Sequence, residues 1–329
     1  MLILKKAFWR FKTTIKTIFW KFKTILKKIY WRLKKLIKVI KYYLNKTKAI
    51  NTIKNSLDGI VFLSNIYPSY DNIYRNMFVH SRVKAFFNKG LVSNVIVVNP
   101  FKCFYLREYE GINIAEINSV ILKQALKDIK GLTLCVHFLN RSIWDGVKDN
   151  LENNKLIIWV HGADIQPWWR RKFNYENNDV ELKKEKKNSE KRMELWKEVF
   201  NHKYKENIHI VFVSEYSKNE AFEDYGVDWP NSNCSVIHNY INIDKFNYIK
   251  KPVEQRKKIL TIKSFSAKTY ANDITQKAII ELSKNKIFDD LEFAIYGDGA
   301  RFEEDTQLLK NFKNVSINKK FLNSDEIAA

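Results

Sequence analysis

The chain contains few of the residues that break regular structure, and few cysteines. It has 9 glycines, 5 prolines and 3 cysteines in 329 residues. So little glycine and proline argues against long disordered linkers. The cysteines, Cys103, Cys135 and Cys234, are odd in number and far apart, which argues against a disulfide framework and for a reducing compartment. We interpret them as small buried hydrophobic residues.

Three further absences concern membranes and charge. No run of about 18 apolar residues occurs, so the sequence predicts no transmembrane helix. The opening apolar stretch ends at Lys5 and Lys6 with no small-residue cleavage site after it, so we expect no secretory signal. Residues 1–50 hold no aspartate or glutamate but sixteen of the 58 basic residues. Most of the formal net charge of +22 therefore belongs to this arm.

The arm, residues 1–50, is built from an eleven-residue repeat that predicts a long amphipathic helix. Three near-copies begin at Lys6, Thr17 and Lys28, and a degenerate fourth begins at Val39. Eleven residues make three turns, so each repeat position keeps its angle along the helix. One face collects aromatic and aliphatic side chains, and the other collects lysine and arginine. This pattern is typical of a helix that lies in an anionic membrane surface.

We therefore expect a cytoplasmic protein that binds peripherally to the inner face of the cell membrane. The predicted membrane-binding side chains come from both faces of the arm and are Phe8, Phe11, Phe19, Phe22, Tyr30, Lys12, Lys23 and Lys34. Trp9, Trp20 and Trp31 fall amid the basic positions, and the sequence leaves open whether they face lipid, protein or glycan. A self-associating helical stalk and a nucleic-acid-binding arm are alternatives. We expect no nucleic acid, because the body shows no basic recognition module.

The body alternates short apolar runs with amphipathic stretches, which predicts parallel sheets covered by helices. The expected strands are 59–66, 93–100, 132–138, 155–162, 208–214 and 233–239. The expected helices are 72–88, 118–130, 183–202 and 217–225. Ser69 or Asp71 is expected to cap the first of these helices, and Gly90 to end it.

A charged break near 244–258 precedes a second series of strands and helices. Strands are expected at 258–265, 291–299 and 315–318, with helices at 272–284 and 303–312. The sequence thus predicts two facing Rossmann-like domains, 58–244 and 258–329, after the arm. The second has three strands where five or six are usual, and 325–329 read as the opening of a helix. We therefore expect the chain to be incomplete at its carboxyl end.

Polar residues follow several predicted strands, where open parallel sheets bind their ligands. Tyr67, Ser69 and Asn72 follow the first strand, and His161 and Asp164 follow the strand at 155–162. In the second series the strand-end positions are Lys263, Lys268, Gly297, Asp298 and Gly299. Each also has an ordinary structural role available, in a helix cap or a tight turn. Their repeated placement at strand ends favours a binding cleft.

At these positions the chain resembles the retaining glycosyltransferases of family four, from about Gly59 to Ala329. The resemblance lies in short segments in a fixed order, which are Tyr67-PS, Phe78-VHSRV, His161-GADI, Ser214-EYSK, Val236-IHNYINIDKF, Ile259-LTIKSFSAKTYAND and Phe293-AIYGDG. It implies the GT-B fold of two facing Rossmann-like domains. It also implies hexosyl transfer from a nucleotide diphosphate sugar to a glycan or lipid-linked acceptor, with retained anomeric configuration.

The resemblance further implies roles for particular residues. Lys263 and Lys268 match the basic pair that holds the donor diphosphate, although position 263 is commonly Arg in the family, and Lys lacks its bidentate fork. His161 matches the residue that faces the donor sugar, and Asp164 either orients it or caps a helix. The loop of Gly297, Asp298 and Gly299 lies on the donor side. The acceptor side is expected to hold Tyr67, Ser69, Asn72, His137, Trp168 and Arg170.

No cofactor beyond the donor and no metal is expected, because no Cys/His cluster with metal spacing occurs. The family's Glu-x7-Glu segment, which grips the donor, is missing from this sequence. We therefore expect this chain alone to be inactive. Two alternatives remain open at this stage. One is a non-catalytic, membrane-tethered sugar-binding or scaffolding module, and the other is a membrane-active arm fused to an unrelated Rossmann-like protein.

Overall fold

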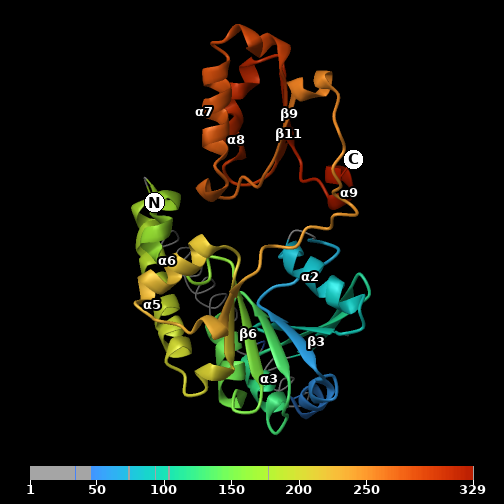
Figure 1. Cartoon of the computed structure of the whole chain (residues 1–329), viewed down its shortest axis with the longest axis vertical. Helices are drawn as coiled ribbons and strands as arrows, with labels where there is room; N and C mark the ends of the chain where they lie inside the picture. The colour runs from blue at the N-terminus through green and yellow to red at the C-terminus, as the bar shows by residue number, and fades with distance from the viewer. Residues whose placement is uncertain are drawn as a thin grey trace, which may run out of the picture. The chain divides into compact units, whose positions relative to one another are not determined.

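The computed structural model of this protein describes residue 34 and residues 46–72, 75–92, 94–102, 104–176 and 178–328. The chain forms two compact units (Figure 1). The first comprises Met1–Asp164 and Lys197–His238, and the second comprises Ile165–Trp196 and Asn239–Ala329. This division groups residues 165–196 with the second unit, whereas the sequence analysis assigned them to the first domain.

The first unit is built on one twisted sheet with the strand order β3-β4-β2-β1-β5-β6-β7-β8. The strands are β1 Ile60–Ser64, β2 Asn94–Val98, β3 Phe104–Tyr109, β4 Ile112–Ile117, β5 Thr133–His137, β6 Lys155–Val160, β7 Ile208–Phe212 and β8 Cys234–Val236. All neighbours pair in parallel except β3 and β4. The helices are α2 Met77–Phe87, α3 Ser119–Leu126, α4 Arg141–Val147 and α6 Glu215–Tyr225. The predicted α/β class with a parallel Rossmann-like sheet is confirmed.

The start of α2 corrects one sequence prediction. The helix begins at Met77 after Asn76, whose φ is 54°, and not at residue 72 after a Ser69 or Asp71 cap. Ser69 and Asn72 instead exchange two backbone hydrogen bonds, Ser69 N to Asn72 O at 3.2 Å and Asn72 N to Ser69 O at 2.9 Å. Because this turn uses their backbone groups, the chain cannot enter a helix at Ser69.

The β3–β4 hairpin was absent from the sequence analysis. Its strands pair from Phe104 with Ile117 to Tyr109 with Ile112. The turn residues Glu110 and Gly111 have φ values of 49° and 82°. A two-residue hairpin loop requires such left-handed residues, which matches the right-handed twist of its strands.

One part of the core of the first unit lies between the sheet and α2. Phe62, Cys135 and Trp159 come from β1, β5 and β6, and they form one buried cluster with Val79 and Val83 of α2. These strands are buried on both faces, as in parallel sheets generally. Helix α2 therefore lies over the strands whose carboxyl ends carry the candidate site.

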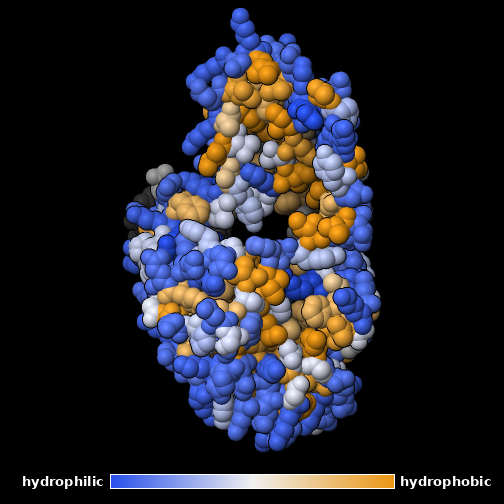
Figure 2. Space-filling view, viewed as in Figure 1, coloured by the Kyte–Doolittle hydropathy of each residue, from blue (hydrophilic) through white to orange (hydrophobic). Residues whose placement is uncertain are grey.

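The second unit holds a smaller parallel sheet in the order β11-β10-β9. Its strands are β9 Lys258–Ile262, β10 Glu292–Gly297 and β11 Val315–Lys319, and its helices are α7 Asn272–Leu282, α8 Phe302–Thr306 and α9 Ser324–Ala328. Helices α7 and α8 lie on one side of the strands (Figure 1), over a core that includes Phe265, Phe293 and Phe302. Leu260 of β9 is 59% exposed, and apolar residues gather on the visible surface of this unit (Figure 2).

The described part of the chain also contains one long helix and several short 3-10 helices. Helix α5, Asp179–Phe200, begins in the second unit and ends in the first. The short 3-10 helices are η1 Lys148–Asn150, η2 Trp168–Tyr175, η3 Lys205–Asn207, η4 Asn231–Asn233, η5 Val253–Lys257, η6 Lys268–Tyr270, η7 Lys286–Asp290 and η8 Gln307–Asn311. The segment of Trp168 and Arg170, expected to be a loop, is thus the 3-10 helix η2.

Only the end of the arm belongs to the described residues. Residues 46–54 are helical, and Ala49 and Ile53 are fully buried. Lys34 is helical and exposed. The other predicted membrane-binding residues lie outside the described part, as do the three tryptophans of the repeat. None of the described helices is long and apolar enough to cross a membrane.

Candidate functional site

The strand order in the sheet of the first unit reverses between β1 and β5. The chain proceeds from β1 to β2 on one side of β1 and later adds β5 on the other side. Ligands of open α/β sheets bind beyond the carboxyl ends of strands at such a point. Here Ser64 ends β1 and pairs with His137, which ends β5. His137 in turn pairs with Trp159 of β6, and His161 follows that strand.

Two histidines meet at this edge. The Nδ1 of His137 and the Nε2 of His161 are 3.0 Å apart, so one nitrogen donates a hydrogen bond and the other accepts it. The His137 ring stacks on Trp159 with ring centroids 5.0 Å apart. Phe78 and Phe138 contact His161 with ring centroids 4.8 and 4.6 Å away. The predicted residues His137 and His161 are therefore brought together inside an aromatic cage.

The surroundings keep both imidazoles uncharged at neutral pH. Burial, then His161 and Arg82, lower the pKa of His137 well below its usual value. Burial and the charge of Arg82 lower the pKa of His161 to about 4. Desolvation disfavours a charged imidazole, and a neighbouring guanidinium adds like-charge repulsion. The pair can therefore offer neutral hydrogen-bonding groups to a ligand.

Asp164 is hydrogen-bonded to the backbone of His161. Its Oδ1 accepts a hydrogen bond from the His161 N–H at 2.9 Å, and the residue is only 9% exposed. Gly162 between them has a φ of 90°, which favours glycine. The sequence analysis considered that Asp164 orients His161 or caps a helix. The structure shows a hydrogen bond from the His161 backbone to Asp164, which fixes the turn after β6.

The expected acceptor-side residues near β1 are differently placed. Tyr67 is 2% exposed, and its hydroxyl lies 2.8 Å from His80 Nδ1. The Nε2 of His80 lies 3.1 Å from a carboxylate oxygen of Glu110. Burial raises the pKa of the Tyr67 phenol. Tyr67 is therefore an inward-facing member of a hydrogen-bonded network, while Ser69 and Asn72 form the turn beside it.

His80 and Arg82 are residues of this region that the sequence analysis did not single out. Both lie on the buried side of α2, at 3% and 8% exposure. The only sequence signal was their position within Phe78-VHSRV, where polar residues occupy a helix face that otherwise carries valine. Polar groups on a buried face usually have a specific partner or role.

In the second unit, Lys263 lies at the start of helix α7. It follows β9, and its Nζ is 3.5 Å from Thr275 Oγ1 in the first turns of the helix. No side chain caps the amino end of α7, where Ala271 has a φ of 54°. Asn272 is buried, and its Oδ1 has no hydrogen-bond partner among the described residues. Free backbone N–H groups beside a lysine are suited to binding phosphate.

Gly297 and Gly299 allow two loops to touch. Their φ values are 154° and 148°. A Cβ on Gly297 would lie 2.0 Å from the Lys263 carbonyl oxygen, and one on Gly299 would lie 2.4 Å from the Phe265 carbonyl carbon. The Phe265 N–H donates to the Asp298 carbonyl at 2.9 Å. The glycines thus hold the loop after β9 against the loop after β10.

Lys268 already has an anionic partner. Its Nζ is 2.6 Å from a carboxylate oxygen of Glu176. The next residue, Thr269, donates its N–H to Asn174 Oδ1 at 3.0 Å. Trp168 and Arg170 belong to η2 in this same unit, and Lys186 lies over the Trp168 ring at 4.3 Å. The structure therefore groups Trp168 and Arg170 with the second unit, which contains Lys268.

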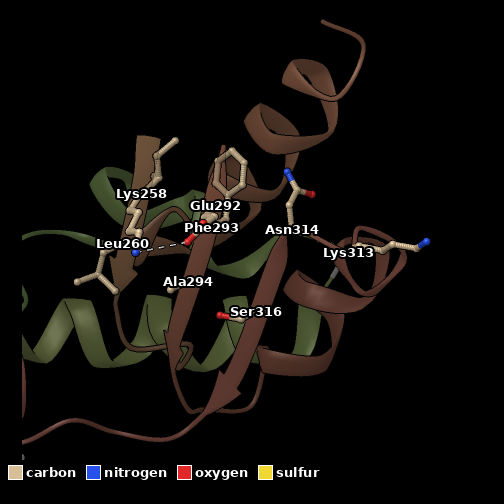
Figure 3. A pocket seen from close by; sticks show the side chains of 9 residues that line it. Lys258, Leu260, Glu292, Phe293, Ala294, Lys313, Asn314 and Ser316 are labelled. Carbon is tan, nitrogen blue, oxygen red and sulfur yellow. Dashed lines mark ion pairs between the residues drawn. The ribbon is translucent and has the colours of Figure 1, made fainter. Parts of the chain in front are cut away.

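Three hollows in the described part of the surface lie away from these edges. One of about 360 Å³ is lined by Lys258, Leu260, Glu292, Ala294 and neighbours (Figure 3). These residues lie toward the amino ends of β9, β10 and β11, and Lys258 is 3.8 Å from Glu292 there. Two more hollows lie at the amino ends of β5 to β8. Because parallel sheets bind ligands at the opposite ends, we assign no site to these hollows.

Among the described residues no group of three or more His, Cys, Asp or Glu side chains could hold a metal ion. Of the cysteines in that part, Cys135 is buried and Cys234 is partly buried, and both are free thiols. Burial raises the pKa of Cys135 to about 12, so this thiol stays protonated.

No protein-family model and no curated protein matches the sequence. Solved structures of similar arrangement include three trehalose phosphate synthases. The enzyme from Burkholderia vietnamiensis has a TM-score of 0.49 and 7% identity, over 83% of this chain and 74% of that one. The enzyme from Burkholderia multivorans gives 0.45 and 10%, over 82% and 74%. A trehalose-6-phosphate synthase studied for glycosyl transfer with retention gives 0.45 and 8%, over 81% and 74%. Similarity at this level concerns the path of the chain and not its chemistry, and the resemblance to family four is not confirmed.

Proposed function

We propose that this chain is a glycosyltransferase that takes a sugar from a nucleotide diphosphate sugar and transfers it to a glycan or lipid-linked acceptor. The observation that carries the proposal is the position of Lys263 at the uncapped amino end of α7, directly after β9. A helix amino end and a lysine together supply backbone N–H groups, a dipole and a full charge to a diphosphate.

The chemistry follows from where charge develops. As the bond between sugar and diphosphate breaks, negative charge grows on the leaving diphosphate. Lys263 and the α7 amino end stabilise that charge, because they are fixed before the reaction begins. Lys268 can join them only by exchanging Glu176 for the phosphate, since the two are now 2.6 Å apart. We therefore assign Lys263 the larger share of diphosphate binding.

His161 is proposed to hydrogen-bond sugar hydroxyls in the first unit. Its pKa of about 4 keeps the imidazole neutral, so it adds no positive charge near a sugar that becomes oxocarbenium-like. Asp164 supports it by fixing the backbone at residue 161. Retention of configuration is part of the proposal through the sequence resemblance alone.

Nucleotide binding tests this function. UDP, GDP and ADP are titrated separately into the protein by isothermal calorimetry, and at least one is expected to bind. Lys263→Ala should weaken that binding at least tenfold, because a charge-assisted phosphate contact is lost. Lys268→Ala should weaken it less. The matched control is Lys258→Ala, at the exposed amino end of the same strand, which should bind as the unaltered protein does.

The outcomes separate the alternatives. If no nucleoside diphosphate binds, or if Lys263→Ala binds like the unaltered chain, the diphosphate site is wrong. If a nucleotide binds through Lys263, the diphosphate site stands. Lack of transfer or hydrolysis by this chain alone is already expected and does not by itself favour a non-catalytic module.

A further inference from the structure

Arg82 is a buried cation without a counter-charge in the described part of the chain. It lies on α2 facing the sheet and is 8% exposed. Among the described residues no carboxylate pairs with it, and its Nη1 has no hydrogen-bond partner. Its guanidinium carbon lies 5.0 Å from the centroid of the Trp159 ring.

Burying an unpaired guanidinium costs folding free energy unless another interaction replaces its hydration. A buried guanidinium loses its hydration, and proteins normally repay this with a carboxylate or another anion. A cation–π contact offsets only a small part of that loss. Burial lowers the pKa of Arg82, but a guanidinium still stays protonated under ordinary conditions. The missing partner is therefore most simply an anion from outside the described chain.

Two neighbours of Arg82 also have unused polar atoms. His137 Nε2 and Trp159 Nε1 are buried and lack partners among the described residues. His137 is fully buried, and its ring stacks on Trp159, which itself contacts Arg82. Buried polar atoms in proteins are nearly always hydrogen-bonded, so three orphans in one cluster indicate a site that a polar ligand completes.

The backbone at this position is strained as well. Phe138, directly after His137, has a φ of 57°. A left-handed conformation is unfavourable for a bulky side chain, and strained residues cluster at ligand sites. The conformation turns the chain sharply at the end of β5, and the Phe138 ring contacts His161.

From these observations we propose that Arg82, together with His137 and Trp159, forms a binding site for a phosphate-type oxyanion at the carboxyl ends of β5 and β6. The guanidinium supplies the charge and paired N–H donors, and the indole N–H supplies a further donor. The site belongs to the first unit and does not depend on nucleotide binding by the second.

Thermal unfolding tests the site with inorganic phosphate as the probe. At a phosphate concentration about ten times its Kd, the midpoint of the unaltered protein should rise by about 2–4 °C over chloride of equal ionic strength. Arg82→Met should abolish this rise. In chloride alone Arg82→Met should be at least as stable as the unaltered protein, because it removes an uncompensated buried charge.

Matched variants separate this site from others. Arg256→Met, which removes an exposed arginine, should keep the full rise. Lys263→Ala should also keep it, which distinguishes this site from the proposed diphosphate site. The proposal is overturned if phosphate gives no rise in the unaltered protein, or if Arg82→Met retains the rise.

A second measurement covers the case in which Arg82→Met does not fold. Phosphate should change the tryptophan fluorescence of the unaltered protein, and Trp159→Phe should remove most of that change. No change on phosphate addition, or a full change in Trp159→Phe, contradicts the proposal. Repeating the titration with glucose 1-phosphate identifies the source of the anion: tighter binding than inorganic phosphate indicates an anionic group on a sugar, and equal or weaker binding indicates the free ion.

Discussion

At the carboxyl edge of the first sheet, burial and neighbouring side chains shift the pKa values of single residues. His137, His161 and Arg82 are three basic side chains within one apolar region, and the two imidazoles stay neutral chiefly because burial lowers their pKa values, with a smaller contribution from the charge of Arg82. This arrangement makes the fold sensitive to protons, since an imidazole that cannot easily become charged inside the protein does so freely once unfolded.

We expect the protein to lose stability as the pH falls from 7 to 4. The pKa of His161 is about 4 when folded and 6.5 otherwise, so in this range the unfolded chain binds more protons. Integrating that difference gives roughly 3 kcal/mol lost by pH 4 from His161, and His137 acts in the same direction. Urea unfolding at several pH values measures the loss.

Two histidine variants show whether His161 causes the loss of stability at low pH. His161→Gln should lose clearly less stability between pH 7 and pH 4 than the unaltered protein does. His238→Gln, which alters an exposed histidine of the same unit, should follow the unaltered protein. Parallel pH profiles for His161→Gln and the unaltered protein would refute the assignment.

Whole elements followed from the sequence where one physical signal dominated. The buried strands β1, β2, β5, β6 and β7 are continuous apolar runs, and each was predicted within a few residues. The β3–β4 hairpin was missed because Arg107, Glu108 and Glu116 interrupt the apolar pattern of an edge pair. The amino end of α2 was misplaced because Ser69 suits a turn as well as a cap.

The residues of the candidate sites could likewise be predicted only in part from the sequence. Strand-end positions such as Lys263 and His161 could be read from the sequence, because parallel strands end at one edge. The pairing of Lys268 with Glu176 could not, since the partner lies 92 residues away in another segment. Nor could the isolation of Arg82, because the sequence does not show which charges a helix face meets.

The contact between the loops after β9 and β10 predicts a sharp effect of one glycine. Gly297→Ala should destabilise the second unit by at least about 3 kcal/mol, because the new methyl group would overlap the Lys263 carbonyl. Nucleotide binding should be lost with it. Chemical unfolding followed by circular dichroism gives the stability, and calorimetry gives the binding.

Gly226→Ala is the matched control. Gly226 has a φ of 59° at the end of α6 but open space around its Cβ position, so only about 1 kcal/mol of backbone strain is expected. Equal losses for the two variants would mean that close approach of the loops contributes nothing at Gly297.

At the scale of the whole molecule, charge is distributed unevenly. Residues 1–50 hold sixteen basic and no acidic side chains, while the remainder is nearly balanced. We propose that the arm attaches the protein to anionic membranes, where a lipid-linked acceptor would reside. Attraction of this kind adds about 1 kcal/mol for each basic residue near the surface and weakens with salt.

Liposome flotation tests the arm. The full chain should bind vesicles that contain phosphatidylserine and should bind phosphatidylcholine vesicles weakly. Replacing Lys12, Lys23 and Lys34 by Glu should reduce binding at least tenfold, and added salt should reduce it further. Deletion of residues 1–45 should remove it, and undiminished binding after that deletion would exclude the arm as the membrane contact.

The division of the chain into two discontinuous units also constrains when each unit can fold during synthesis. The polypeptide crosses between units after Asp164, Trp196 and His238, so neither unit is one continuous stretch. During synthesis residues 165–196 leave the ribosome before the segment 239–329 that completes their unit. The first unit likewise waits for residues 197–238 to add β7 and β8 at the edge of its sheet. Early segments therefore spend time exposed, and chaperone dependence should be greatest for nascent chains that end between residues 165 and 238.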